Sequence, residues 1–185
     1  MREEFYDLEI NQINKLTNGE YENCSFTNCS FKKDALINSN FSECIFDSCD
    51  LSMAEVANIS FKEVSFKDCK ILGLRFDECN DFLLSFNFEN CILSFSSFFK
   101  LELRSINFLN CKLLDVDFTK TILTNSVFEN CDLNGAIFKD TILDKADFTS
   151  SYNFSINPEI NSLKKTKFSV LGLPGLLDKY DIVLG

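Results

Sequence analysis

Six tetrapeptides of the form Phe-X-X-Cys decide the fold: Phe26-Thr27-Asn28-Cys29, Phe46-Asp47-Ser48-Cys49, Phe66-Lys67-Asp68-Cys69, Phe88-Glu89-Asn90-Cys91, Phe108-Leu109-Asn110-Cys111 and Phe128-Glu129-Asn130-Cys131. They follow one another at spacings of 20, 20, 22, 20 and 20 residues. A seventh copy, Phe148-Thr149-Ser150-Ser151, keeps the phenylalanine and replaces the cysteine by serine. A fixed period of this length is typical of solenoids, in which each repeat packs on its neighbours along one axis.

A finer period of five lies inside each repeat. Large apolar residues recur every five positions, and a second, usually smaller residue stands two positions before each of them. Five fits neither the 3.6-residue period of a helix nor the 2-residue period of a strand. It fits a coil with four short sides, each of which contributes one large and one small inward residue. Stacking the chain at 20 residues per coil predicts two core columns, of phenylalanine (Phe26, Phe46, Phe66, Phe88, Phe108, Phe128 and Phe148) and of cysteine (Cys29, Cys49, Cys69, Cys91, Cys111 and Cys131).

This pattern resembles that of the pentapeptide-repeat family, A(D/N)LXX. The best matching segments are Ala146-Asp147-Phe148-Thr149-Ser150, Cys131-Asp132-Leu133-Asn134-Gly135 and Ala136-Ile137-Phe138-Lys139-Asp140. The resemblance covers residues 21 to about 150. It implies an all-β fold, a right-handed quadrilateral β-helix with phenylalanine or leucine stacked in its core.

Three segments are expected along the chain. Residues 1–20 lack the repeat, and alternation over 6–10 indicates a short strand in an N-terminal cap. Residues 21–150 form the β-helix, with a two-residue bulge near 80–83 where the spacing lengthens. Residues 151–185 are expected to form a C-terminal cap and dimerisation tail, with a helical turn from Asn157-Pro158-Glu159, a short helix over 173–180 and a last strand over 181–184.

All nine cysteines fall in the small inward position, there is no C-X-X-C pair, and the chain has no histidine. Stacked cysteines on neighbouring coils would have parallel Cβ directions, which is poor disulfide geometry. We therefore expect free thiols that act as small hydrophobic residues, and no metal or cofactor. Free thiols suit a reducing cytoplasm. The amino terminus has no apolar signal segment, and no apolar run reaches transmembrane length, so a cytoplasmic location is predicted.

The net charge of −10 argues against nucleic acid as a direct ligand. Two interpretations of the acidic surface stay open: it keeps the rod soluble, or it imitates a polyanion. An enzyme is not expected, because the sequence offers no glycine-rich phosphate loop, nucleophile elbow or histidine base.

The C-terminal segments Asn157-Pro158-Glu159-Ile160-Asn161 and Gly172-Leu173-Pro174-Gly175-Leu176-Leu177 resemble those of pentapeptide proteins that protect type II topoisomerases. That resemblance implies quinolone resistance or immunity to gyrase poisons, through a tail-to-tail homodimer that mimics duplex DNA and binds DNA gyrase or topoisomerase IV. The candidate partner-binding residues are Glu102, Asp115, Asp117 and Asp132, and the candidate dimerisation residues are Leu173, Leu176, Leu177, Tyr180 and Ile182. The alternative is a generic cytoplasmic scaffold that binds an unidentified protein.

Overall fold

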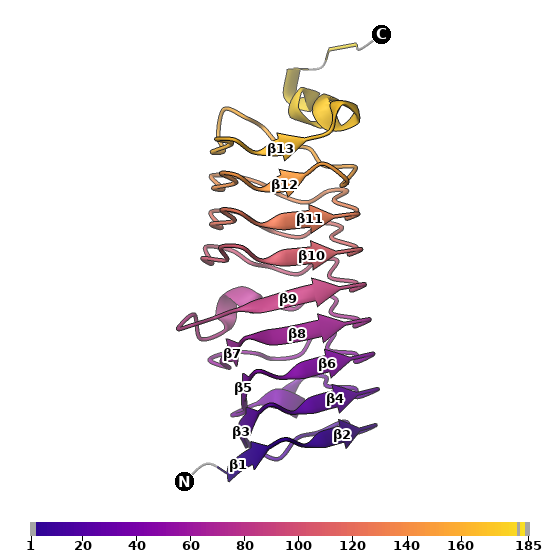
Figure 1. The fold of residues 1–185 in the computed structure, drawn as a ribbon, viewed down its shortest axis with the longest axis vertical. Helices are drawn as coiled ribbons and strands as arrows, with labels where there is room; N and C mark the ends of the chain where they lie inside the picture. The colour runs from indigo at the N-terminus through magenta and orange to yellow at the C-terminus, as the bar shows by residue number, and fades with distance from the viewer. Residues whose placement is uncertain (1–2, 181, 184–185) are drawn as a thin grey trace.

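The computed structural model describes residues 3–180 and 182–183. The chain winds into a tall stack of coils, with the two termini at opposite ends of the rod (Figure 1). Two parallel sheets and two rows of single bridges join each coil to the next. The chain is therefore a parallel β-solenoid with little helix, as the resemblance implied.

The described part of the chain contains short strands and 3-10 helices. The strands are β1 Glu3–Tyr6, β2 Glu9–Asn11, β3 Gly19–Glu22, β4 Ser25–Thr27, β5 Asn40–Ser42, β6 Ile45–Asp47, β7 Phe61–Lys62, β8 Val64–Lys67, β9 Phe86–Glu89, β10 Asn107–Leu109, β11 Val127–Glu129, β12 Asp147–Phe148 and β13 Lys167–Phe168. The 3-10 helices are η1 Asp34–Leu36, η2 Phe76–Glu78, η3 Val170–Leu176 and η4 Asp178–Tyr180.

The rod has four faces, which we number in the order in which the chain meets them. Face 1 is the nine-stranded sheet in the order β13-β12-β11-β10-β9-β8-β6-β4-β2. Face 2 is the row of bridges from Ser30 through Lys112 to Tyr152, and face 3 carries the row from Arg75 to Ile137. Face 4 begins as the sheet β1-β3-β5-β7 and continues as the bridges from Glu102 to Ser162. Successive faces lie five residues apart, which is the physical basis of the five-residue period.

Phenylalanine side chains fill the rod. The structure places the seven residues of the predicted column under face 1, each no more than 1% exposed. Their rings stack nearly parallel from coil to coil, with centroids 5.3 Å apart for Phe88–Phe108 and 5.0 Å for Phe108–Phe128. A second column, Phe76–Phe98–Phe118–Phe138, meets the first edge-on. At about 25 cal/mol per Å2 of buried apolar surface, each such ring contributes about 2–3 kcal/mol.

The small inward position holds hydrogen-bond donors as well as small side chains. All nine cysteines are free and buried. The thiols of Cys49, Cys69 and Cys131 each lie 3.3–3.4 Å from a carbonyl oxygen one coil earlier. The hydroxyls of Thr121 and Thr141 occupy the same position on other faces and donate to carbonyls at 2.8 Å.

The corners between faces use left-handed backbone. Asn28, Ser48, Asp68, Asn90, Asn110 and Asn130 all have φ between 51° and 54° at one corner. Such angles favour Asn and Asp among non-glycine residues. The Asn110 amide also donates to Asn90 Oδ1 at 3.0 Å, and the Asn130 amide donates to Asn110 Oδ1 at 3.2 Å. The repeated asparagines thus form turns and a ladder along the rod.

The N-terminal segment forms two strands where the sequence favours one over residues 6–10. β1 pairs with β3 and β2 with β4, both in parallel, at an offset of 16 residues. The Phe5 ring stacks on Tyr21 at 4.7 Å. Residues 3–18 are therefore wound as the outermost coil, four residues shorter than the coils that follow.

The two extra residues lie between Asn80 and Phe86. Ser60 bridges Asn80 at an offset of 20, whereas Val64 pairs with Phe86 at an offset of 22. The chain that leads into β9 projects beyond its neighbours at the left edge of the rod (Figure 1). Phe82 is 72% exposed there.

The C-terminal segment lies across the last coil. Asn157-Pro158-Glu159 forms a turn, in which Asn157 Oδ1 accepts from the Glu159 amide at 2.9 Å. Helical structure starts at Val170, three residues before the expected helix, because Ser169 Oγ accepts from the Gly172 amide at 3.1 Å. The strand predicted over 181–184 falls partly outside the described residues.

Candidate interaction surfaces

The four carboxylates predicted to bind a partner lie on different sides of the rod. Glu102 is on face 4, Asp117 on face 3 and Asp132 on face 2, and Asp115 occupies the corner between faces 2 and 3. The structure therefore brings Asp115 and Asp117 near each other and leaves the other two apart.

Local contacts hold three of these four carboxylates. Glu102 pairs with Arg104. Asp117 accepts from the Thr119 amide at 2.8 Å, and Asp132 accepts from the Asn153 side chain at 2.9 Å. These contacts stabilise turns, so the four residues do not compose one binding surface.

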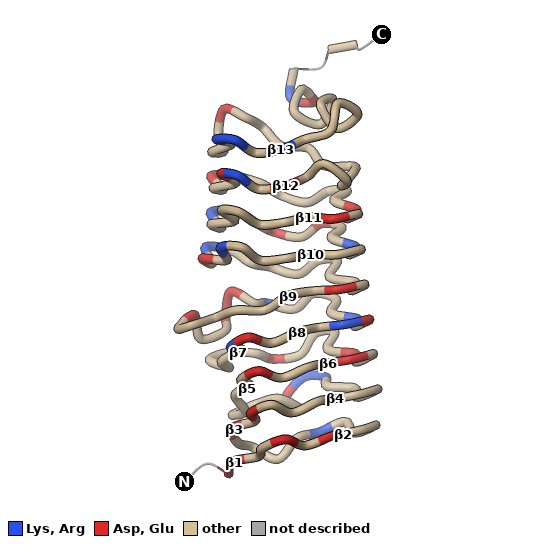
Figure 2. Tube along the Cα trace, viewed as in Figure 1, with Lys and Arg blue, Asp and Glu red and all other residues tan. Residues whose placement is uncertain are grey.

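A different set of carboxylates does gather, at the corner between faces 4 and 1 in the first four coils. We call it the acidic edge: Glu4, Asp7, Glu20, Glu22, Glu43 and Glu63. Glu4 pairs in register with Glu20, and Asp7 accepts from the Asn23 side chain at 2.6 Å. In Figure 2 the acids follow one another from β1 past β3 and β5 to β8. Lys62 is the base among them.

The same corner turns basic near the other end. We call this part the basic edge: Arg104, Lys145, Lys164 and Lys165. The Lys145 amide donates to the Lys164 carbonyl at 2.8 Å, which places these residues on successive coils. Blue segments mark this edge beside β12 and β13 in Figure 2. One corner of the rod is therefore polarised along its length.

The sequence reading missed the acidic edge. Its members come partly from residues 1–20, which lack the repeat, and partly from repeat positions that elsewhere hold Ser or Lys. Comparing residues 20 apart, such as Asn23, Glu43 and Glu63, is the signal that finds it.

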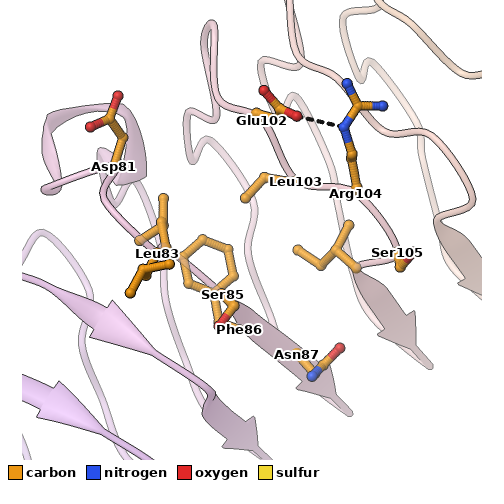
Figure 3. Close-up of a pocket in the computed structure, with 11 residues that line it drawn as sticks. Asp81, Leu83, Ser85, Phe86, Asn87, Glu102, Leu103, Arg104 and Ser105 are labelled. Carbon is orange, nitrogen blue, oxygen red and sulfur yellow. Dashed lines mark hydrogen bonds and ion pairs between the residues drawn. The ribbon is translucent and has the colours of Figure 1, made fainter.

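A groove of about 390 Å3 opens on this corner where the two-residue insertion separates two coils. Leu83, Leu84 and Ile106 contribute apolar walls, and the Glu102–Arg104 ion pair lies at one rim (Figure 3). Leu83 is exposed, as is its neighbour Phe82. The middle of the polarised corner is thus hollow and partly apolar.

The predicted dimerisation residues divide into two groups. Leu173, Tyr180 and Ile182 are exposed, whereas Leu176 and Leu177 are half-buried and Leu176 packs against the core. Leu171, at 92% exposed, and Val183, at 97%, add apolar surface that the sequence reading did not single out.

The tail also seals the end of the rod. Its Gly175 carbonyl accepts from the Ile156 amide at 2.9 Å, and Tyr180 and Lys179 both contact Glu159. The inner side of the tail is therefore a cap, and its outer side is an exposed apolar surface.

Comparison with known proteins fits this geometry. The family model "Pentapeptide repeats" matches residues 24–62 and 111–149, in eight copies. The chain is a pentapeptide-repeat protein. The matched segments flank residues 63–110, which contain the insertion and the groove. Among curated proteins, none matches the sequence at a significant level.

Two solved structures similar to this pentapeptide-repeat protein are trypsin-treated variants of QnrB1, described as a plasmid-mediated fluoroquinolone resistance protein. One has a TM-score of 0.59 at 20% identity and covers 98% of this chain and 97% of that chain. The other has a TM-score of 0.58 at 21% identity and covers 100% of both chains. At these identities the likeness concerns the fold.

The chemistry on offer in this pentapeptide-repeat protein is that of a binding surface. Burial raises the pKa of the Cys44 thiol to about 12, so it is not a nucleophile at neutral pH. No group of three or more possible metal ligands occurs within the described residues. None of the helices in the described residues has the length and apolar character that a membrane span requires.

Proposed function

We propose that this pentapeptide-repeat protein is a non-enzymatic, cytoplasmic DNA mimic that binds a type II topoisomerase, DNA gyrase or topoisomerase IV, and protects it from quinolones or gyrase poisons. The acidic edge is the surface that meets the DNA-binding side of the topoisomerase.

The charge density of the acidic edge carries this proposal. Its six carboxylates span four coils, about 14 Å at the 4.8 Å spacing of neighbouring strands. Duplex DNA carries about eight phosphate charges over that length. With Lys62 included, the edge has a net charge of about −5, a comparable density on a rigid rod. The basic edge limits the mimicry to the N-terminal half.

The likeness to QnrB1 supports the same target. That protein is described as a fluoroquinolone resistance protein. Fluoroquinolones are quinolones, which act on type II topoisomerases, and the match extends over the whole rod. The likeness in fold brings this function here as a hypothesis, and the acidic edge supplies its physical basis.

A supercoiling assay tests the proposal. We expect the purified protein at micromolar concentration to restore gyrase supercoiling in the presence of a fluoroquinolone and to lower the amount of drug-stabilised cleaved DNA. Glu43→Lys with Glu63→Lys should reduce the protection about tenfold, because it reverses two charges of the acidic edge. The control is Glu89→Lys with Glu129→Lys, which changes the net charge equally on face 1. No protection at micromolar protein would contradict the proposal and favour a scaffold for another protein.

We also propose that the outer side of the tail forms a homodimer interface. Exposed apolar residues Leu171, Leu173 and Ile182 would be covered by the same surface of a second copy, as in isologous dimers. Leu171→Asp with Leu173→Asp should give a monomer in light scattering at concentrations where the tail alone would hold a dimer. These substitutions preserve β13, which truncation near Asn157 would remove. A tail variant with an unchanged mass would contradict a tail-mediated dimer.

A further inference from the structure

The polarised corner has a regular order of residues. Nine levels of the rod each present one corner residue between faces 4 and 1: Asp7, Asn23, Glu43, Glu63, Ser85, Ser105, Asn125, Lys145 and Lys165. We call these nine residues the corner strip. Its lower levels are acidic, its middle levels small and neutral, and its upper levels basic.

A second copy turned end for end is complementary to this strip. A two-fold axis through Ser105, on level six, sets level three against level nine and level four against level eight. Glu43 then faces Lys165, and Glu63 faces Lys145. The neighbouring row on face 4 follows the same rule, since Lys62 on level four faces Asp144 on level eight. The match needs no change of spacing, because both copies have the same rise per coil.

The charges of the corner strip are available for such contacts. Among the described residues, Glu43, Glu63, Lys145 and Lys165 are exposed, and their side chains take part in no ion pair within 4.0 Å. Close to the axis, Arg104 would approach its own copy, but its pairing with Glu102 offsets its charge.

The middle of the corner strip permits close approach. Ser85, Ser105 and Asn125 are small, and the groove of about 390 Å3 lies between the coils of Ser85 and Ser105 (Figure 3). Phe82 and Leu83 project beside Ser85, one level from the axis. A small neutral centre with adjoining apolar side chains and charged flanks has the arrangement of a protein interface, an apolar core with a polar rim.

We propose that a second copy of this chain docks antiparallel along the corner strip, with Ser105 at the two-fold axis. The contact is isologous, so each Glu–Lys pair occurs twice. It is distinct from the tail contact, and it is independent of the topoisomerase. Since its charges are exposed, it weakens as salt rises.

A cysteine at the axis tests this arrangement in the full-length protein. Ser105→Cys should form a disulfide-linked dimer under mild oxidation at low salt, because residue 105 of one copy meets residue 105 of the other. The unsubstituted protein is the control, since its nine cysteines are buried. A matched control is Ser150→Cys, at an exposed corner of face 1, which should give far less dimer. Raising sodium chloride to about 0.5 M should lower the Ser105→Cys dimer yield.

Charge exchange makes the test specific. In the Ser105→Cys background, Glu43→Lys with Glu63→Lys makes the flanks of the strip wholly basic, and Lys145→Glu with Lys165→Glu makes them wholly acidic. Each variant alone should crosslink at least about tenfold less, because every attraction becomes a repulsion. An equimolar mixture of the two should crosslink again. Both residue types already occupy left-handed corners, as at Glu43 and Lys145, so both variants should fold. Circular dichroism verifies this.

Three outcomes would overturn the proposal. They are a Ser105→Cys protein that yields no more dimer than the Ser150→Cys control, a yield unaffected by either charge reversal, and a mixture that crosslinks no better than its components. The readout contains no topoisomerase, so it stands or fails separately from the proposed function. A tail dimer does not place residue 105 beside its own copy.

Discussion

The thiol of Cys49 lies 3.3 Å from the carbonyl oxygen of Phe26, one coil earlier. Ser151 donates to Phe128 O in the same way at 2.6 Å. We therefore expect Cys49→Ser to keep its stability within about 1 kcal/mol, and Cys49→Ala to lose about 1 kcal/mol with the donor. Cys49→Leu should lose more, about 1–3 kcal/mol, because the position is fully packed. Urea midpoints of the three variants check this order. A serine variant as unstable as the leucine variant would contradict it.

The phenylalanine column predicts a large cavity effect. Phe108 is fully buried between Phe88 and Phe128, so Phe108→Ala should lower the free energy of unfolding by about 3–5 kcal/mol. Phe95→Ala is the matched control, because that ring is 64% exposed and its loss should cost less than about 0.5 kcal/mol. Thermal and urea unfolding measure both. Equal losses would mean that the stacked rings do not carry the stability of the rod.

The left-handed corner at Asn110 predicts an ordering of substitutions. With φ of 52°, a β-branched side chain is strained there, whereas glycine is not. Asn110→Gly should lose about 1 kcal/mol through the amide ladder, and Asn110→Val should lose about 1–2 kcal/mol more. Leu114→Val, on the neighbouring face without a left-handed angle, is the control. The prediction fails if the valine variant is as stable as the glycine variant.

Acid should loosen the last coil through Asp147. Burial acts to raise the pKa of Asp147, but hydrogen bonds from Thr149 and the Lys167 ammonium outweigh it and lower the pKa from its ordinary 3.8. The folded pKa is the lower one, so this stabilisation is present above pH 3.8 and is lost as the pH falls further.

We expect the urea midpoint to fall between pH 5 and 3, and Asp147→Asn to show a smaller fall, because it keeps the acceptor and removes the titration. Urea titrations of both proteins at half-unit pH intervals measure the difference. Identical pH profiles for the two proteins would exclude this contribution.

Much of the fold could be predicted because one side-chain position repeats in every coil. A five-residue period assigns each residue to the inside or the outside, and a 20-residue coil then sets Phe88 against Phe108 without further information. The first coil escaped this reasoning. Its 16-residue length breaks both periods, and only the pairing of β1 with β3 shows that Phe5 continues a stack.

The surface was harder to predict than the core, for a physical reason. Inward positions are selected for size and recur visibly, whereas outward positions tolerate most residues, so their arrangement appears only when coils are aligned. Asp115 and Asp117 are close in sequence and invite grouping, yet Glu43 and Glu63 lie on the same corner although 20 residues separate them. The donor role of the thiols was hidden similarly, because sequence shows that Cys49 is small but not which carbonyl faces it.

The constant 20-residue coil makes the length of this protein a discrete quantity. Excising residues 111–130 would bring Phe148 onto Phe108 and leave every later residue on its own face, so a shorter rod with the same cross-section should result. Excising 15 residues would rotate all that follows by a quarter turn and bring each face into a neighbour's place. Insertions and deletions in such a gene are therefore tolerated by whole storeys, and the two added residues before β9 survive because a corner takes them up.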